Sequence, residues 1–155
     1  MKEIFGDAWE LSKHFDILCI TTNGMVKKDG SCVMGRGIAY EAKNRVKGIE
    51  FILGQKITES GNHVHALDWI NDNYNSTLIL SFPVKHNWYE KADIELIKRS
   101  CVELVERMNS ITSELNVLLP RPGCGNGGLN WEDVKAEIEP LLDDRFTIVS
   151  FAEKE

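Results

Sequence analysis

A run of glycines within LLPRPGCGNGGLNWED, residues 118–133, is the part of this sequence best suited to chemistry. Four of the six residues at 123–128 are glycine, an apolar run ending at Leu119 precedes them, and Asn130 follows as a predicted helix N-cap. Backbone amides in such a turn can converge on an anion, aided by the helix dipole, and glycine permits close approach to a phosphate. The alternative is an ordinary long turn rich in glycine.

A second glycine loop, VMGRGIA at residues 33–39, strengthens the interpretation as an anion site. Gly35 and Gly37 lead directly into a predicted helix, and the loop follows a predicted strand. Ligands of parallel sheets lie beyond the carboxyl ends of the strands, so two such loops could clamp one diphosphate. The run at 123–128 matches neither the dinucleotide pattern nor a P-loop, since no Lys-Ser/Thr pair follows it.

The elements that would hold both loops alternate between strand-like and helix-like segments. Four short apolar runs predict buried strands, at residues 16–21, 76–82, 116–119 and 146–151. Apolar residues at helical spacing predict helices over 37–45, over 94–108 with Asp93 as N-cap, and around Val134, Ile138, Leu141 and Leu142. Strands that are apolar on both faces and separated by helices predict an α/β layered domain with a largely parallel sheet.

The composition is that of one ordinary globular domain over residues 1–155, with 43% apolar and 27% charged residues. A net charge of -6 argues against a general basic surface for nucleic acid, which leaves room only for a local basic pocket. The chain begins without a signal-peptide pattern, and no apolar run approaches the ~18 residues of a membrane span. We therefore expect a cytoplasmic protein with no membrane partner.

The cysteines and histidines show no metal-binding spacing. There is no C-x-x-C pair, and the histidines have no supporting cysteine or carboxylate pattern. Free thiols in a reducing compartment, and neither a metal nor another cofactor, are expected. The residues concerned are Cys19, Cys32, Cys101, Cys124, His14, His63, His65 and His86.

Four segments carry a resemblance to the macrodomain family: GDAW at 6–9, GRGIAYEAK at 35–43, SFPVKHNW at 81–88 and PRPGCGNGGLNW at 120–131. Within that family the chain resembles the DNA- and protein-directed ADP-ribosyl hydrolases, a branch that includes the antitoxin of the DarT/DarG pair. The resemblance implies a three-layer α/β/α fold with a mixed, largely parallel central sheet. It also implies ADP-ribose as ligand, which suits two phosphate-cradling loops.

The resemblance assigns roles to individual residues. Asp7, beside Ala8, would accept a hydrogen bond from the adenine amino group, although aspartate also caps helices. Phe151 would pack on the adenine, or equally in the core. The first loop would lie over the diphosphate and distal ribose through Asn23, Gly35, Gly37 and Ile38. The second loop would cradle the phosphates through Gly123, Cys124, Gly125, Asn126 and Gly127.

Lys85 is the catalytic candidate, because it matches the lysine of an F-P-x-K segment in the family's DNA-directed glycohydrolases. The resemblance implies that it attacks or stabilises the anomeric carbon of the distal ribose. A nucleophilic lysine must be unprotonated, which a desolvated site favours. The alternative is a solvated surface lysine. His86 and Trp88 in the same loop could stack on a base or ribose, or simply pack within the loop.

One position departs from the family pattern. The protein-directed glutamyl hydrolases carry an aspartate where this chain has Gly127, which argues against removal of glutamate-linked ADP-ribose. The loop at 25–33 is also longer than usual, which leaves its alignment open.

Three functions remain open. The first is a hydrolase that removes ADP-ribose from a modified macromolecule, with nucleic acid favoured over glutamyl protein. The second is an ADP-ribose 1''-phosphate phosphatase, and the third is a non-catalytic ADP-ribose reader. The partner is accordingly ADP-ribose or an ADP-ribosylated macromolecule, and the oligomeric state is left open.

Overall fold

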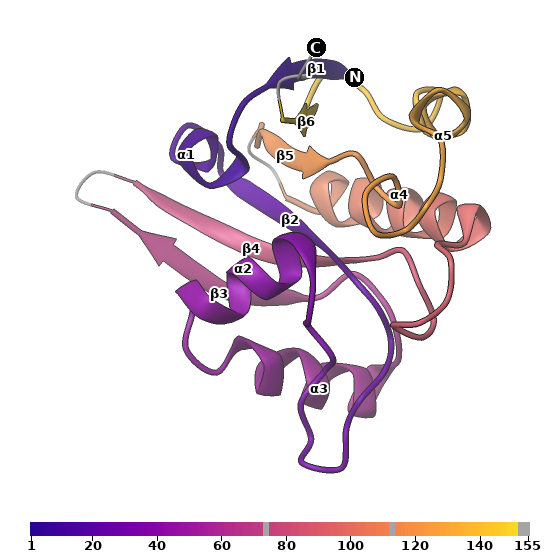
Figure 1. Ribbon diagram of the computed structural model, residues 1–155. Coiled ribbons are helices and arrows are strands. Elements are labelled where there is room, and N and C mark those ends of the chain that lie inside the picture. The colour runs from indigo at the N-terminus through magenta and orange to yellow at the C-terminus, as the bar shows by residue number, and fades with distance from the viewer. Residues whose placement is uncertain (73–74, 112–113, 152–155) are drawn as a thin grey trace.

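The computed structural model describes residues 1–72, 75–111 and 114–151, and these contain one sheet of six strands (Figure 1). The strands are β1 (Lys2–Phe5), β2 (Ile17–Thr22), β3 (Ala66–Asn71), β4 (Ser76–Pro83), β5 (Val117–Pro120) and β6 (Phe146–Ser150). Their spatial order is β1-β6-β5-β2-β4-β3. Neighbouring strands are parallel except for β3, which pairs antiparallel with β4. The predicted mixed, largely parallel sheet is therefore confirmed.

Helices cover both faces of this sheet. They are α1 (Ala8–Ser12), α2 (Gly37–Arg45), α3 (Ile49–Ser60), α4 (Ile94–Asn109) and α5 (Trp131–Ile138). In Figure 1, α4 and α5 lie on one side and α1, α2 and α3 on the other, so the predicted three layers are present. None of the helices in the described ranges is long and apolar enough to cross a membrane.

The alternation of side chains along a strand explains why the strands are apolar on both faces. In β2, Ile17 and Cys19 pack in the core beneath α4 and α5. Leu18 and Ile20 point to the opposite face and pack beneath α1, α2 and α3. Each of these four side chains is at most 2% exposed, so β2 is a central strand of the domain.

The predicted helix starts are confirmed, but one predicted helix end is wrong. Asp93 accepts the Glu95 amide at 2.9 Å as the N-cap of α4. Beyond Ile138, Leu141 and Leu142 belong to a turn and not to α5. Pro140 supplies the physical reason, because it has no amide hydrogen to continue the helix and its ring clashes with the preceding turn.

Three loops meet where adjacent parallel strands have their carboxyl ends, and we call this end of the sheet its C-terminal edge. Residues 23–36 connect β2 to α2, residues 84–93 connect β4 to α4, and residues 121–130 connect β5 to α5. This edge is where parallel α/β sheets bind ligands. The end of β6 lies at the same edge, since its Val149 is in register with Pro120 of β5.

Candidate ligand-binding and catalytic site

A cavity of about 860 Å³ opens at this edge of the sheet, between the two glycine loops. Its lining contains all of the predicted site residues except Asp7. Those that line it are Ala8, Asn23, Gly35, Gly37, Ile38, Lys85, Gly123, Cys124, Gly125, Asn126, Gly127 and Phe151. Segments more than 100 residues apart in the sequence therefore meet around one space.

The two glycine loops approach each other closely at one point of the cavity lining. A Cβ at Gly37, whose φ is +61°, would lie 3.3 Å from the Asn126 side-chain nitrogen. A Cβ at Gly35 or at Gly125 would meet no heavy atom within 4 Å, and neither residue has a left-handed φ. Neither packing nor backbone conformation requires glycine at these two positions, so glycine there keeps the backbone open to the cavity.

Backbone donors in both loops are available to a ligand. Among the described residues, the amides of Gly125, Asn126 and Gly127 donate to no protein acceptor. On the opposite side, Arg36 is the N-cap of α2, and its side chain does not cap the helix. The first amides of α2 and its dipole are thus free to act on an anion at the Gly37 end.

The charged side chains of the lining also favour an anion. Arg36, Lys85 and Arg121 line the cavity, against the single carboxylate of Glu41. Arg121 is held by aromatic neighbours, with its guanidinium 5.1 Å from the Trp131 ring centroid. The cavity is therefore locally positive in a chain whose net charge is -6.

Three buried polar atoms in the lining lack a hydrogen-bond partner among the described residues. They are Trp9 Nε1, Thr22 Oγ1 and Arg121 Nε. An unpaired buried polar group costs about 1–3 kcal/mol. All three residues line the cavity, although these particular atoms are themselves shielded from it by surrounding protein atoms. Trp9 stands in the GDAW segment, where residue type and position alone do not predict that it lines the cavity.

Lys85 lies at the mouth of the cavity and connects two loops. Its Nζ donates to the carbonyl of Trp88 at 3.3 Å and to the carbonyl of Asn126 in the second glycine loop at 3.2 Å. Its own carbonyl accepts from Asn62 Nδ2 at 3.0 Å. The side chain is half-buried. Lys85 is therefore oriented at both ends, which differs from a freely solvated surface lysine.

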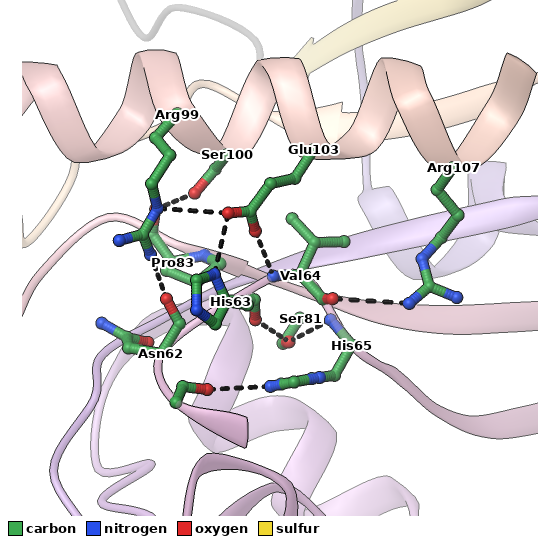
Figure 2. A network of polar contacts seen from close by, with 11 residues as sticks. Asn62, His63, Val64, His65, Ser81, Pro83, Arg99, Ser100, Glu103 and Arg107 are labelled. Atoms are coloured by element: carbon green, nitrogen blue, oxygen red, sulfur yellow. Dashed lines mark hydrogen bonds and ion pairs between the residues drawn. The ribbon is translucent and has the colours of Figure 1, made fainter.

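A polar network on α4 fixes the segment that holds Lys85 (Figure 2). Glu103 accepts from the Val64 amide at 2.9 Å, from Arg99 Nε at 3.2 Å, and lies 2.8 Å from His63 Nδ1. Arg99 in turn donates to the Asn62 carbonyl. The backbone on both sides of His63, at Asn62 and Val64, is thus bonded to α4. These bonds position the side-chain amide of Asn62, which donates to the Lys85 carbonyl.

The two residues predicted to contact adenine, Asp7 and Phe151, differ in where the structure places them. Asp7 Oδ1 accepts the amides of Trp9 at 2.8 Å and Glu10 at 3.2 Å, so Asp7 is the N-cap of α1. The predicted hydrogen bond from the adenine amino group to Asp7 stays a prediction. Because Oδ1 caps the helix, Oδ2 would have to accept that bond. Phe151 lines the cavity and is 72% exposed, so the alternative that it packs in the core is wrong.

The long loop at 25–33 forms a small hairpin, closed by a bridge between Val26 and Cys32. Asn23 pins its base, because its Nδ2 donates to the Val33 carbonyl at 2.9 Å and its Oδ1 accepts the Met25 amide at 3.0 Å. Both polar atoms of the Asn23 side chain are therefore engaged in shaping the first loop.

His86 does not line the cavity. Its Nε2 lies 2.9 Å from Asp93 Oδ2, and this hydrogen bond holds the pKa of the Asp93 carboxyl below its ordinary value. Cys124 does line the cavity, and partial burial raises the pKa of its thiol to about 11. No group of three or more metal-ligating side chains gathers in the described residues.

Structural comparison gives the class to which this fold and cavity belong. The chain superposes on the macrodomain of Thermus aquaticus DarG with a TM-score of 0.77, at 22% identity, over 98% of this chain and 97% of that one. For the macrodomain of Mycobacterium tuberculosis DarG the TM-score is 0.74, at 24% identity, over 95% and 96% of the two chains. The chain therefore has the macrodomain fold.

Sequence comparison places it near the same group. A DNA ADP-ribosyl glycohydrolase of Mycobacterium tuberculosis is 30% identical over 112 residues, which are 68% of this chain and 30% of that protein. One from Thermus aquaticus is 29% identical over 114 residues, covering 72% and 31%. The chain thus spans under a third of the length of these relatives. No family model matches the chain.

Proposed function

We propose that this chain is a single macrodomain that binds ADP-ribose in the cavity and hydrolyses its bond to modified DNA. Two relatives are named DNA ADP-ribosyl glycohydrolases, and a similar solved structure, with a TM-score of 0.76 and 20% identity, is Thermosipho africanus DarTG in complex with ADP-ribose. The observation that carries the proposal is the pair of unobstructed glycines, Gly35 and Gly125, on opposite loops of one cavity.

The diphosphate of ADP-ribose fits between the two loops. The unpaired amides of Gly125 and Gly127 would cradle one side, and the N-terminus of α2 would face the other. Arg36 and Arg121 add positive charge. Hydrogen bonds to a charged group contribute about 1.5–3 kcal/mol each, so a few of them suffice to place the diphosphate.

Lys85 would act at the anomeric carbon of the distal ribose. Hydrolysis breaks the bond between this carbon and the base, while water supplies a hydroxyl to the carbon and a proton to the departing base. As an ammonium held by two carbonyls, Lys85 can stabilise the negative charge that develops on the departing base. As a neutral amine it would instead bond to the anomeric carbon of the ring-opened sugar and displace the base, which leaves with a proton, and water would then hydrolyse the resulting imine to free ADP-ribose and the amine. Lys85→Arg separates the two roles, because guanidinium stays protonated and cannot be a nucleophile.

Gly127 supports DNA over glutamyl protein as the substrate. A Cβ at this position would lie 2.4 Å from the Gly123 carbonyl oxygen, so an aspartate cannot be introduced without moving the loop. The loop conformation, and not only the sequence, is therefore incompatible with the carboxylate of the glutamyl hydrolases.

A panel of substrates tests the proposal. Wild-type protein is incubated with ADP-ribosylated single-stranded DNA, glutamyl-ADP-ribosylated protein and ADP-ribose 1''-phosphate, and released ADP-ribose and phosphate are quantified. We expect the fastest release from DNA. A phosphatase would release phosphate from ADP-ribose 1''-phosphate faster than it releases ADP-ribose from DNA, and a reader would bind ADP-ribose without turnover on any substrate. Either result would overturn the proposal.

A further inference from the structure

A second hollow of about 410 Å³ shares part of its lining with the cavity. We call it the outer groove. It is lined by Arg36, Lys85, Trp88, Tyr89, Glu90, Lys91, Asn126, Gly127 and Gly128.

The outer groove is continuous with the cavity at the catalytic candidate. Arg36, Lys85, Trp88, Asn126 and Gly127 line both spaces. If the distal ribose lies beside Lys85, the group attached to its anomeric carbon must leave the cavity past this lysine. The outer groove is therefore in the path of the acceptor.

Two exposed aromatic rings form one wall of the outer groove. Trp88 is 49% and Tyr89 is 65% exposed, although large aromatic side chains usually bury most of their surface. The rings are perpendicular, with centroids 5.7 Å apart. Each ring therefore keeps a face or an edge open to a ligand, and Tyr89 lines only the outer groove.

The groove also carries cations that the protein itself does not neutralise. Arg36 and Lys91 form no ion pair with any residue in the described ranges. Lys91 lies along the backbone at Gly128, where a Cβ would be 3.7 Å from its Cγ. Together with Lys85 they oppose one acidic lining residue, Glu90, in a chain of net charge -6.

We propose that the outer groove binds the single-stranded DNA flanking the modified nucleotide, with a base stacked on Tyr89 and phosphates beside Arg36 and Lys91. Aromatic rings stack on any unpaired base, and cations along such a groove follow the backbone. Paired bases offer no free face, so the strand must be single. This inference rests on the proposed function, since it assumes that DNA carries the ADP-ribose.

The first test compares two substrates, ADP-ribosylated mononucleoside and an ADP-ribosylated oligonucleotide of about ten nucleotides, within the usual size of a single-strand site. We expect wild type to have the higher kcat/KM on the oligonucleotide. Tyr89→Ala should lower that value about tenfold, as loss of one stacked base predicts. Tyr40→Ala is the matched control, because Tyr40 is 48% exposed on α2 and lines neither space.

The second test needs no turnover. Binding of an unmodified, fluorescently labelled oligothymidylate is measured by anisotropy over a range of salt concentrations. Lys91→Ala should reduce the slope of log K against log salt by about 0.7, the value for one lost single-strand phosphate contact. The matched duplex should bind more weakly than the single strand, because its paired bases offer no free face to Tyr89.

The outcomes separate this inference from the proposed function. If wild type releases ADP-ribose equally well from both substrates and does not bind the oligothymidylate, the proposed function stands and the outer groove is not a DNA site. If wild type binds the oligothymidylate through Tyr89 but releases ADP-ribose from neither substrate, the groove stands and the proposed hydrolysis falls. Equal or tighter binding of the duplex overturns the assignment to a single strand.

Discussion

Two glycines of the same loop should respond in opposite ways to substitution by alanine. Gly125 has open space around its missing Cβ and no left-handed φ. At Gly127 a Cβ would lie 2.4 Å from the Gly123 oxygen and 2.7 Å from its carbonyl carbon. We expect Gly125→Ala to impair ligand binding without harming the fold, and Gly127→Ala to destabilise the protein.

The magnitudes follow from these surroundings. At Gly125 an alanine restricts the unfolded chain and should raise the free energy of unfolding by about 0.4–1 kcal/mol. The added methyl would obstruct a charge-assisted hydrogen bond to phosphate that contributes about 1.5–3 kcal/mol, so ADP-ribose affinity should fall roughly 10- to 100-fold.

At Gly127 the clash must be relieved by moving the loop. The movement disturbs the hydrogen bond from Leu129 N to Gly123 O and the one from Ala92 N to Gly127 O, both 2.9 Å long. Two such bonds contribute about 1–3 kcal/mol together. For a domain of this size that loss corresponds to a decrease in Tm of about 2–12 °C.

Calorimetric titration with ADP-ribose and thermal unfolding, applied to both variants and wild type, measure the two effects. Wild-type affinity in Gly125→Ala would refute the claim that this glycine is kept bare for the ligand. An unchanged Tm in Gly127→Ala would refute the steric reading of the loop.

Three further predictions concern single side chains. Asp7→Asn should keep the cap of α1, and therefore the Tm, but weaken ADP-ribose binding, since an amide NH₂ would face the adenine amine; unchanged affinity would make Asp7 only a cap. Alkylation of Cys124, followed by mass spectrometry, should keep accelerating about tenfold per pH unit between pH 8 and 10, because its pKa of about 11 keeps the thiol protonated; a plateau near pH 9 would contradict this burial effect. Glu103→Ala should cost about 1–3 kcal/mol in denaturant unfolding, since it leaves the Val64 amide unpaired, and an unchanged midpoint would argue against the network.

The central elements were predictable from sequence because their apolar pattern is set by burial on both faces. The strands β2, β4, β5 and β6 all appear within one residue of the predicted runs, and α2 matches the predicted 37–45. The elements that were not predicted lie at the edges. In β1 (Lys2–Phe5) only Ile4 is partly buried, and β3 alternates without an apolar run, so neither carries the signal of a buried strand.

The helix α3 was missed for a different reason. Gly54 stands in its middle, where glycine is unfavourable by about 1 kcal/mol relative to alanine. The structure explains it, because a Cβ there would lie 1.9 Å from the carbonyl oxygen of Gly30 in the hairpin at 25–33. A contact between segments more than 20 residues apart is not visible in a local pattern.

The candidate site shows the same division. Residue type, spacing and family resemblance were enough to predict the glycine loops and Lys85 as candidates, and the structure places them around one cavity. The positions of Arg121 and Thr22 in the lining could not be predicted, because only the assembled cavity brings them beside the glycine loops. Asn62 and Tyr89 likewise depend on which loops meet at Lys85.

The most direct test of the account is a single-turnover measurement of ADP-ribose release from an ADP-ribosylated single-stranded oligonucleotide by wild type and Lys85→Ala, with the Kd of each for free ADP-ribose measured in the presence of a chelator. We predict release by wild type and none by Lys85→Ala, while the two Kd values agree within a few-fold because other groups hold the diphosphate and adenine. Release by Lys85→Ala at the wild-type rate would contradict the account.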